Sequence, residues 1–548
     1  MESVFEATFQ SSTLFLEQND KTLLKIEKLH GRDLGGGNFS WTGKITGSEN
    51  STLSFTRVGH EIVGGLKPSF GAIQRFITDK GKVIWLKTKK SNHLSCGGCL
   101  LDQKQKNLDP RPGRRAKNWR DGDGNLIDLL VAYTSDAKLS ENLSTESQVE
   151  AYLQNAISES NLCFLNSNVN AAIRLVHLVE IDYAETQDPS MDLNRSTNPT
   201  DGYLDQLHTL RDQYGADLVS VLISQGDGSL GGIANSMSYP SLDFGESGFN
   251  VVVIGQIGAP SYSLLHEIGH NMGCTHNRED AMDRGVPDTD PSNNSLFKQF
   301  NYGKRWITNG QGYRTIMAYD TDGTPTYTNR IPYFSNPSIA YQGISTGNLD
   351  SEDNAQVLNT TTPYVSNFRS SIVQGIVPSI YSLNISEGNA SSLTVRLASK
   401  PESNVSISIS LDSAGDQDFS LLDSSTMTFS PESWNLPQPL QLISKKDADA
   451  NNGISTIYLS STGIPTTSVA LNEIDTGSDT TSYRLITGVI KDSQDVGVPN
   501  VSLSFSSEGT PILTDENGTF NIFYGNPQKI ISQIVANTKI NFFSWNRL

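Results

Sequence analysis

The chain has 548 residues, enough for three or four domains, with 36% hydrophobic and 18% charged residues and a formal net charge of −18. This composition excludes a disordered or collagen-like chain, and the acidic balance without a dense Lys/Arg run excludes a sequence-independent nucleic-acid binder and a polybasic membrane anchor. Four Cys exclude a disulfide scaffold, and there is neither an apolar stretch of the roughly 18 residues that span a bilayer nor a visible secretory signal at the start.

The N-terminal region reads as short β-strands up to about residue 100. Its strand-like segments alternate polar and apolar residues between Gly, Asn and Ser; they are SWTGKITG (40–47), STLSFTRV (51–58) and KVIWLKT (82–88). Residues 102–125 follow as a polar, basic stretch that contains Arg111, Arg114 and Arg115. The polar composition of this stretch predicts an exposed linker. Proteolytic nicking concentrates in such segments.

Strands and helices alternate from residue 126 to about 370, which indicates a layered α/β core. The predicted buried strands are IDLLVAYT (127–134), DLVSVLIS (217–224) and NVVVIG (250–255). Thr145 and Gln148 form a capping box before an amphipathic helix. A second helix is predicted over 202–214, where Gly215 would end it.

Beyond about residue 374 helical periodicity disappears, and alternating Ser, Thr, Val and Ile segments recur. These segments are SLTVRLA (392–398), NVSISISL (404–411), TMTFS (426–430) and ISTIYLSS (454–461). They predict β-sandwich modules, which the polar segment 475–482 divides. The predicted fold class is therefore multidomain, with an α/β domain between a β-rich N-terminal region and C-terminal β-sandwiches.

Residues 264–276 carry residues typical of a metal site and read LLHEIGHNMGCTH. His266 and His270 are four apart, so on a helix they project from one face and can bind one metal ion. Glu267 can reach a water on that metal, and Gly273 can take the left-handed conformation that ends the helix and brings His276 to the same ion. Three protein ligands leave one position open for water, as a catalytic zinc site requires.

Chance does not account for this pattern, although a bare HExxH alone would be ambiguous. The residue frequencies of this chain give on the order of 10⁻⁵ chance copies of the full pattern with its Gly and third His. Three of the eight histidines fall within it. The remaining five show no partner spacing and are interpreted as ordinary surface or core residues: His30, His60, His93, His177 and His208.

The pattern resembles the metzincin clan of zinc metalloendopeptidases and, within it, the bacterial reprolysin-like (adamalysin-type) proteases. The segments that carry the resemblance are GGIAN (231–235), HEIGHNMG (266–273), NYGKRW (301–306), RTIMAY (314–319) and IPYFSNP (331–337). The resemblance implies a catalytic domain at 116–372, with a twisted mixed sheet, a zinc-binding helix and one catalytic Zn²⁺ on the three His. Asn277 departs from the Asp usual in animal relatives, and their disulfide pattern is absent.

The resemblance also assigns roles around the metal. It implies that Met317 forms an apolar floor beneath the ligands, and that Glu267 is the general base for a zinc-activated water. Tyr319 would contact zinc or the reacting oxyanion, with a packed aromatic as the alternative. The stretch 232–238 is the expected edge strand that pairs with an extended substrate.

The region 1–115 resembles a propeptide, which implies a zymogen released near Arg115. Cys96 or Cys99 would then occupy the open zinc position as a cysteine switch; a local disulfide or two idle thiols is the alternative. Cys274 either pairs with Cys163 or is simply buried, and the sequence leaves both open.

Two C-terminal modules resemble known β-families. Residues 376–476 are similar to a Calx-beta-like module, through SLNISEGNASSLTVRLASKP (382–401) and TFSPESWNLPQPLQL (428–442). That family often binds Ca²⁺, for which Asp447, Asp449 and Asn451 are candidate ligands, with a solvated polar turn as the alternative. Residues 483–548 are similar to a carboxypeptidase-regulatory-like β-sandwich. The tail, residues 541–548, departs from the pattern of that family, as expected of a truncated chain.

We therefore expect a zinc metalloendopeptidase that acts on protein or peptide substrates. The family implies a secreted or cell-surface location, with attachment to a surface or matrix through the C-terminal modules. An adhesin or matrix-binding protein with a scaffold-only peptidase domain is the alternative; degenerate relatives usually lose the Glu or a His, whereas this chain keeps all of them. A third hypothesis, a cytoplasmic zinc protein, depends only on the absence of a visible secretory signal.

Overall fold

The computed structural model divides the chain into two compact units, Met1–Val373 and Gln374–Leu548, and each unit is described by itself. The structure describes residues 12–17, 23–48, 51–67, 74–79, 82–86, 95–96, 100–101, 125–225, 230–283, 300–320, 326–349, 351–447, 451–475, 484–492, 496–499, 501–505, 512–514, 518–524, 531–535 and 542–545. Almost all of the predicted linker, together with Cys99 and Asp449, lies outside these ranges. The predicted domain boundaries stay predictions.

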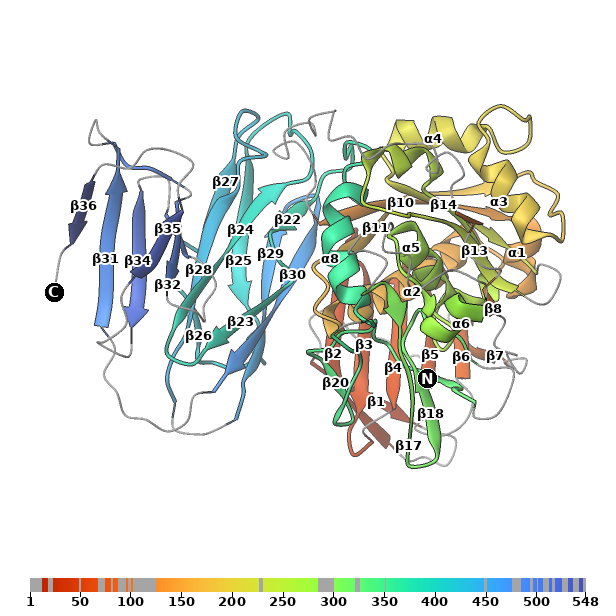
Figure 1. The fold of residues 1–548 in the computed structure, drawn as a ribbon, viewed down its shortest axis with the longest axis horizontal. Helices are drawn as coiled ribbons and strands as arrows, with labels where there is room; N and C mark the ends of the chain where they lie inside the picture. Colours follow the sequence, from red (N-terminus) through yellow and green to blue (C-terminus); the bar gives the residue numbers. More distant parts are fainter. Residues whose placement is uncertain are drawn as a thin grey trace. The chain divides into compact units, whose positions relative to one another are not determined.

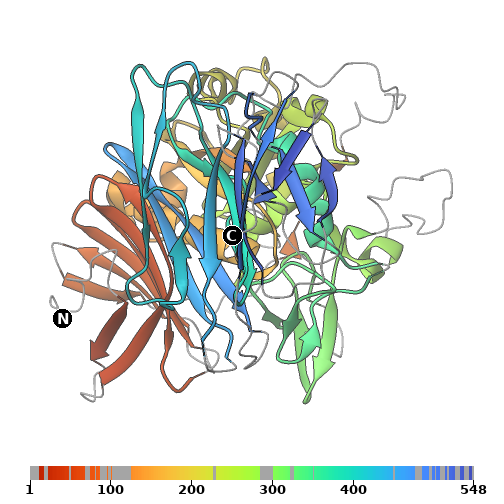
Figure 2. The same cartoon turned by 90° about the vertical axis from the view of Figure 1, so that its left-hand side faces the viewer.

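The first unit begins with a seven-stranded antiparallel sheet, called here the N-terminal sheet (Figure 1). Its strands follow chain order: β1 (Thr13–Glu17), β2 (Leu23–Gly35), β3 (Asn38–Ile45), β4 (Thr52–Val58), β5 (Glu61–Lys67), β6 (Gln74–Asp79) and β7 (Lys82–Leu86). Residues alternate between its two faces, so Trp41, Phe55 and Phe76 pack in a core of the sheet's own. The hydroxyl-bearing face, with Ser40 and Ser54, contacts the helix α2 (Glu146–Asn166). Figure 2 shows the red strands of the N-terminal sheet beside the orange segment that includes this helix.

A mixed sheet forms the centre of the first unit. Its strand order is β11 (Ala172–Ile181), β10 (Leu126–Thr134), β12 (Leu218–Ile223), β14 (Phe249–Val253) and β13 (Leu230–Ser236). The first four strands are parallel, whereas β13 runs antiparallel to β14. All of β10 is buried, because Leu129 and Val131 face one hydrophobic core and Leu130 and Ala132 face another.

Helices cover both faces of this sheet. The α-helices are α1 (Ser135–Ser140), α2, α3 (Pro189–Thr197), α4 (Gln206–Tyr214), α5 (Ser263–Asn271), α6 (Arg278–Asp283) and α8 (Asn354–Val365). Short 3-10 helices span Leu242–Ser247 and Ile254–Gln256. The helices α2 and α5 pack in one core through Leu153 and Ile268, and α3 and α4 pack in the other through Leu193 and Leu207.

Several short strands follow α5 along the chain. They are β15 (Thr275–Asn277), β16 (Tyr302–Gly303), β17 (Arg305–Thr308), β18 (Gln311–Arg314), β19 (Asn329–Arg330), β20 (Ala340–Tyr341) and β21 (Ile344–Ser345). Two further short strands from the N-terminal region, β8 (Ser95–Cys96) and β9 (Leu100–Leu101), pair in parallel with β13.

The second unit is all β. One sheet holds β22 (Ile376–Pro378), β24 (Ala390–Leu397), β28 (Gln438–Ser444) and β26 (Phe419–Leu421), and the other holds β23 (Ser382–Ser386), β30 (Ile464–Ile474), β29 (Ile454–Ser461), β25 (Val405–Leu411) and β27 (Thr426–Phe429). Side chains of both sheets share one core, as in a β-sandwich. Two three-stranded sheets follow: β34 (Thr519–Tyr524), β31 (Arg484–Lys491) and β36 (Phe542–Trp545), then β33 (Ile512–Leu513), β32 (Ser502–Phe505) and β35 (Ile531–Val535).

The structure confirms the multidomain outline: an antiparallel N-terminal sheet, a mixed α/β region and C-terminal β-rich sheets. The helix predicted over 202–214 is shorter than expected and begins at Gln206, because the Asp205 carboxylate accepts a hydrogen bond from the Gly202 N–H and Gly202 has a positive φ. Gly215 ends that helix in the left-handed conformation, as predicted. Within the described ranges, no helix is both long and apolar enough to cross a bilayer.

Candidate metal centre

Three imidazoles converge at the end of the buried helix α5. His266 and His270 lie one turn apart on α5, and Gly273, with a φ of +94°, turns the chain so that His276 on β15 returns to them. One ring nitrogen from each His lies within 4.8 Å of the other two, and the Nε2 atoms of His270 and His276 are 3.0 Å apart. The three imidazoles therefore form a ready-made site for a metal ion.

The other nitrogen of each ring is held by the protein. The Nδ1 atom of His266 lies 2.9 Å from the Ile316 carbonyl, and that of His270 lies 2.8 Å from the Cys274 carbonyl. His276 differs, because its Nδ1 lies 2.9 Å from a carboxylate oxygen of Asp280. These acceptors fix the tautomer in which Nδ1 carries the proton and Nε2 offers its lone pair to a metal.

Burial favours the neutral, metal-binding form of His266. It lowers the pKa of His266 well below its ordinary value, and the charges of His270, Arg330 and His276 lower it further. The Nε2 atom of His266 is buried and has no hydrogen-bond partner in the described part of the chain. A buried three-imidazole set with one orphaned nitrogen fits Zn²⁺, which accepts imidazole ligands in catalytic sites with an open position.

Glu267 lies beside the triad and against the strand β13. Its side chain is fully buried, and a Cβ atom built on Gly232 would lie 2.8 Å from Glu267 Oε1. Only glycine at position 232 leaves room for this carboxylate. The contact places Glu267, the residue after the ligand candidate His266, against the strand β13.

Met317 packs against the helix α5. It is fully buried, and a Cβ atom on Gly269 of α5 would lie 2.5 Å from its sulfur. The backbone of the helix therefore approaches Met317 closely because residue 269 is glycine. Its role as an apolar floor beneath the metal ligands stays a prediction.

Residues 123–335 match the model of the Metallo-peptidase family M12, of the reprolysin type. This part of the chain is a reprolysin-like M12 metallopeptidase domain. The M12 domain holds all three His of the triad, and the three-His cluster is consistent with the catalytic Zn²⁺ of such peptidases.

Curated relatives support the same assignment. The chain is 31% identical over 265 residues to a peptidyl-Asp metalloendopeptidase of Xanthomonas campestris pv. campestris, across 47% of this chain and 56% of that protein. It is 33% identical over 224 residues to proteins of the same name from two strains of Stenotrophomonas maltophilia, across 40% of this chain and 48% of each relative. The chain thus spans about half the length of these relatives. A solved chaperone–substrate complex aligns with a TM-score of 0.33 and 15% identity over 57% of this chain and 40% of that chain, too low a score to carry an argument.

The outer strand of the M12 domain is already paired. Gly232 of β13 is the register partner of Cys96 on β8, and Asn235 and Ser236 are the partners of Leu100 and Leu101 on β9. The predicted substrate strand 232–238 therefore lies next to a segment of the N-terminal region. Of the two cysteine-switch candidates, Cys96 has its backbone at the level of Gly232, and Cys99 lies outside the described residues.

Tyr319 stacks on a metal ligand. Its ring centroid lies 3.8 Å from that of His276, at an interplanar angle of 28°. The Tyr319 N–H donates to Asn277 Oδ1 at 3.0 Å, so Asn277 connects the strand of the third His to the segment after Met317. The described contacts of Tyr319 are thus those of a packed aromatic, and its contact with zinc or an oxyanion stays a prediction.

Sequence reasoning missed Asp280. It lies four residues after His276, on α6, and its carboxylate accepts from the His276 imidazole. The i, i+4 spacing was visible in the sequence, but so many acidic residues have such a neighbour that the spacing alone decides nothing. Gly232 was also missed as a contact of Glu267, because that contact depends on how β13 packs against α5.

The cysteines of the M12 domain are unpaired thiols. Cys163 on α2 and Cys274 after α5 are both buried and free, which decides between the two alternatives for Cys274. Burial raises the pKa of each thiol well above its ordinary value, so both stay protonated and act as small apolar groups.

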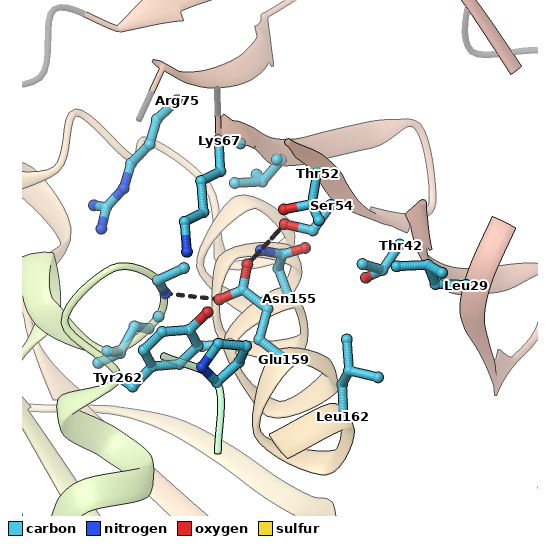
Figure 3. Close-up of a pocket in the computed structure, with 18 of the residues that line it drawn as sticks. Leu29, Thr42, Thr52, Ser54, Lys67, Arg75, Asn155, Glu159, Leu162 and Tyr262 are labelled. Carbon is cyan, nitrogen blue, oxygen red and sulfur yellow. Dashed lines mark hydrogen bonds between the residues drawn. The ribbon is translucent and has the colours of Figure 1, made fainter. Parts of the chain in front are cut away.

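A cavity of about 400 Å³ lies away from the triad, between the N-terminal sheet and α2 (Figure 3). Glu159 of α2 crosses this interface: it accepts from Ser54 Oγ of β4 at 2.7 Å and from the Ala259 N–H at 2.7 Å. Arg75 of β6 pairs with Glu141 at 3.2 Å and donates to the Gly255 carbonyl at 3.0 Å. The N-terminal sheet is therefore bound to the M12 domain through polar contacts, several of them to the segment that leads into α5.

The predicted calcium ligands lie among acidic residues of the sandwich in the second unit. The Asp447 N–H donates to Glu387 at 2.9 Å, and Asn451 is described, whereas Asp449 is not. Burial and the charges of Asp416 and Asp447 raise the pKa of Asp418 to about 6. Calcium binding stays a prediction.

Proposed function

We propose that this protein is a zinc-dependent metalloendopeptidase that hydrolyses peptide bonds in protein substrates. The observation that carries the proposal is the convergence of three buried, tautomer-fixed imidazoles beside the buried carboxylate of Glu267, within a domain that matches the M12 family. The metzincin and bacterial reprolysin-like resemblance of the sequence supports the same reading.

Each residue of the proposed site has its own role. A bound Zn²⁺ supplies Lewis acidity, which lowers the pKa of water towards about 7 and polarises a carbonyl oxygen. Glu267 takes the proton from the attacking water and returns it to the leaving amine, the two tasks of a general base and acid. His266, His270 and His276 hold the metal, and Met317 supports them from below. The outer edge of β13 binds the extended substrate through backbone hydrogen bonds.

The substrate preference follows from the relatives. They are named peptidyl-Asp metalloendopeptidases, and we infer that this chain also cleaves bonds next to Asp.

Replacement of the proposed base tests this function directly. In Glu267→Gln the metal ligands are untouched, so the protein should still bind one Zn²⁺. After the linker is cut in variant and parent, casein hydrolysis by the variant should be lower by at least about 10²-fold, the lower limit of general acid–base catalysis. Metal content by mass spectrometry and casein digestion are measured on the same preparation. A Gln variant that digests casein as fast as the parent would remove Glu267 from the mechanism.

The pairing of β8 and β9 with β13 supports a zymogen. A strand bound there occupies the backbone groups that an extended substrate needs. We therefore propose that residues 1–115 act as a propeptide, released at the Arg-rich linker near Arg115. A thiolate of Cys96 or Cys99 at the metal would add to this block.

The C-terminal modules complete the proposal. The sandwich of the second unit supports a Calx-beta-like module, followed by a carboxypeptidase-regulatory-like one. We propose that both attach or space the enzyme at a cell surface or matrix outside the cell. The adhesin alternative keeps the same modules but predicts that metal-loaded protein cleaves nothing.

A further inference from the structure

A buried amide network joins the helix α5 to the outer strands of the mixed sheet. Asn271 follows the ligand candidate His270 on α5, and its side chain is fully buried. Its Nδ2 atom donates to the carbonyl of Asn235 on β13, at 2.8 Å, and to that of Phe249 on β14, at 3.0 Å. Its Oδ1 atom accepts from Nδ2 of Asn250, also on β14, at 2.8 Å. One side chain therefore connects α5 with two neighbouring strands.

The network lies where the pairing of β13 with β14 ends. The last register pair of the two strands is Ala234 with Asn250, and the two carbonyls bound by Asn271 belong to the next residue on each strand. An antiparallel ladder pairs N–H groups with carbonyls, so two carbonyls cannot satisfy each other and need an outside donor. The amide of Asn271 has two N–H groups and supplies both.

The partners of Asn271 determine how its amide is oriented. Carbonyl oxygens accept and cannot donate, so the atom that faces Asn235 and Phe249 must be the nitrogen. Asn250 then presents its own nitrogen to Asn271, and this leaves Asn250 Oδ1 buried with no hydrogen-bond partner among the described residues. An orphaned buried oxygen is destabilising. The fold keeps this network at a cost in stability, as proteins often do near functional sites.

The strand that Asn271 holds also contacts the proposed general base. Gly232, which precedes Asn235 on β13, packs against Glu267. Beyond Asn235, the Met237 N–H donates to a carbonyl of α5 at 3.1 Å. The other edge of β13 pairs with β8 and β9, and it is the edge assigned to the substrate. A shift of β13 at Asn235 would therefore move a bound substrate relative to the catalytic groups on α5.

We propose that Asn271 is a positioning residue that holds the substrate strand β13 in place relative to the metal centre. The inference rests on the proposed endopeptidase function and deepens it, because it names a side chain on which the alignment of an extended substrate depends. The hydrogen bonds of Asn271 go to the sheet, so it acts on the substrate through β13. A misplacement of about 1 Å at a reacting group can lower a rate on the order of 10²-fold.

Peptides of two lengths test this assignment. A short quenched fluorescent peptide, and one extended by about four residues on each side of the same cleaved bond, are hydrolysed by linker-cut, zinc-loaded wild type and Asn271→Ala. Wild type should have the higher kcat/KM on the extended peptide, which forms more backbone hydrogen bonds with β13. We expect Asn271→Ala to lower the extended-to-short ratio of kcat/KM by about 10-fold, because the displaced strand misaligns the longer peptide more. Both peptides meet the same active fraction, so partial misfolding cancels from the ratio.

Asn161→Ala is the matched control. Asn161 on α2 is another buried amide that joins a helix to a strand: it donates to the Ile173 carbonyl at 3.0 Å and accepts from the Ile173 N–H at 2.7 Å. Ile173 belongs to β11, which lies at the opposite side of the mixed sheet from β13. Asn161→Ala should therefore lower the stability of the protein but keep the wild-type ratio.

Two binding measurements complement the kinetics. The metal ligands are oriented by acceptors to which Asn271 does not hydrogen-bond, so zinc affinity in Asn271→Ala should stay within about threefold of wild type. The Glu267→Gln protein, with its linker cut, is titrated with each peptide by fluorescence anisotropy, with and without Asn271→Ala. The tighter binding of the extended peptide should weaken by about 10-fold in the double variant. If Asn271→Ala does not fold, Asn271→Ser takes its place, with the same expected change.

The outcomes separate the two proposals. If the Asn271 variant keeps the wild-type extended-to-short ratio, in kinetics and in binding, the positioning role is wrong and the endopeptidase stands. A lower zinc affinity with an unchanged ratio also overturns the inference, because Asn271 would then support the metal ligands instead. If wild type does not distinguish the two lengths, β13 does not bind the substrate and the inference is wrong. Zinc-loaded, linker-cut wild type that cleaves neither casein nor either peptide overturns the proposed function, and the inference with it.

Discussion

The imidazoles of the triad differ in the acceptor that holds them. Backbone carbonyls accept from His266 and His270, whereas a carboxylate of Asp280 accepts from His276. A carboxylate acceptor makes an imidazole a stronger metal ligand than a neutral carbonyl does. His276 is thus the ligand whose binding strength depends most on a single side chain.

Removing Asp280 should weaken metal binding. We expect Asp280→Ala to lower zinc affinity by about 10- to 100-fold, as is common when such a partner is lost, and Asp280→Asn to lose less because its amide oxygen still accepts a hydrogen bond. Competition with a chromophoric chelator measures the affinity, and the absorption spectrum of the Co²⁺-loaded protein reports ligand geometry. Asp136→Ala, an exposed acid in the first turn of α1, is the control. Equal affinities in Asp280→Ala and wild type would contradict the role.

Gly232 should be required for activity rather than for metal binding. In Gly232→Ala the new methyl group would lie 2.8 Å from Glu267 Oε1, so the carboxylate must move. We expect kcat on a peptide to fall by about 10²-fold or more, the share of a general base, while zinc content stays at one ion. Full activity in Gly232→Ala would show that Glu267 does not act from the position described here.

At the scale of elements, β13 connects substrate binding with latency. It is the outer strand of the mixed sheet, it contacts Glu267 through Gly232, and it pairs with β8 and β9. In the proposed zymogen, the same backbone edge cannot bind a substrate and the N-terminal segment together. The proposal therefore predicts that β8 and β9 leave β13 on activation.

Cutting the linker should release activity. Limited trypsin treatment at Arg114 or Arg115 cuts the chain after β8 and β9, so that these strands can leave β13. The loss of a few backbone hydrogen bonds to β13 corresponds to at least about a tenfold rise in peptide hydrolysis. Activity that does not change after a complete cut would argue against the zymogen.

Local sequence determined the elements and the ligands better than the contacts between them. The capping box at Thr145 places the start of α2, since Thr145 accepts from the Gln148 N–H, and the spacing of the three His with Gly273 places the triad. The predicted helix over 202–214 is too long, because residues 202–205 form a turn that periodicity does not reveal. In that turn the Asp205 carboxylate accepts a hydrogen bond from the Gly202 N–H. That Arg305, Arg314 and Arg330 lie at one level of a sheet could not be foreseen, because their placement depends on the register of β17, β18 and β19.

At the scale of the molecule, each of the two units has hydrophobic cores of its own. Core residues around the triad come from positions 58 to 368, and the sandwich core comes from positions 376 to 471. Metal site and sandwich therefore rest on separate sets of packed side chains. Each unit should respond to solution conditions through its own titratable groups.

The second unit should lose stability as pH rises. The folded state raises the pKa of Asp418 from 3.8 to about 6, so it favours the neutral carboxyl: this contribution is fully present below pH 3.8 and is lost as the pH rises through 6. In calorimetry the unfolding transition of this unit should move to lower temperature between pH 4.5 and 7.5. Asp418→Asn should remove that part of the pH dependence and raise the transition temperature at pH 7.5. An identical pH profile in wild type and variant would contradict the assignment.

The hydrogen bonds at the three Nδ1 atoms have a consequence for how the enzyme matures. Because the protein itself orients every ring, the apo-chain has little left to organise when the ion arrives, unlike small zinc domains that are unfolded without their metal. Zinc can therefore bind after the chain has folded, and its binding is reversible. A preparation stripped by chelator should keep its circular dichroism spectrum and regain full turnover when zinc is restored, with no refolding step between.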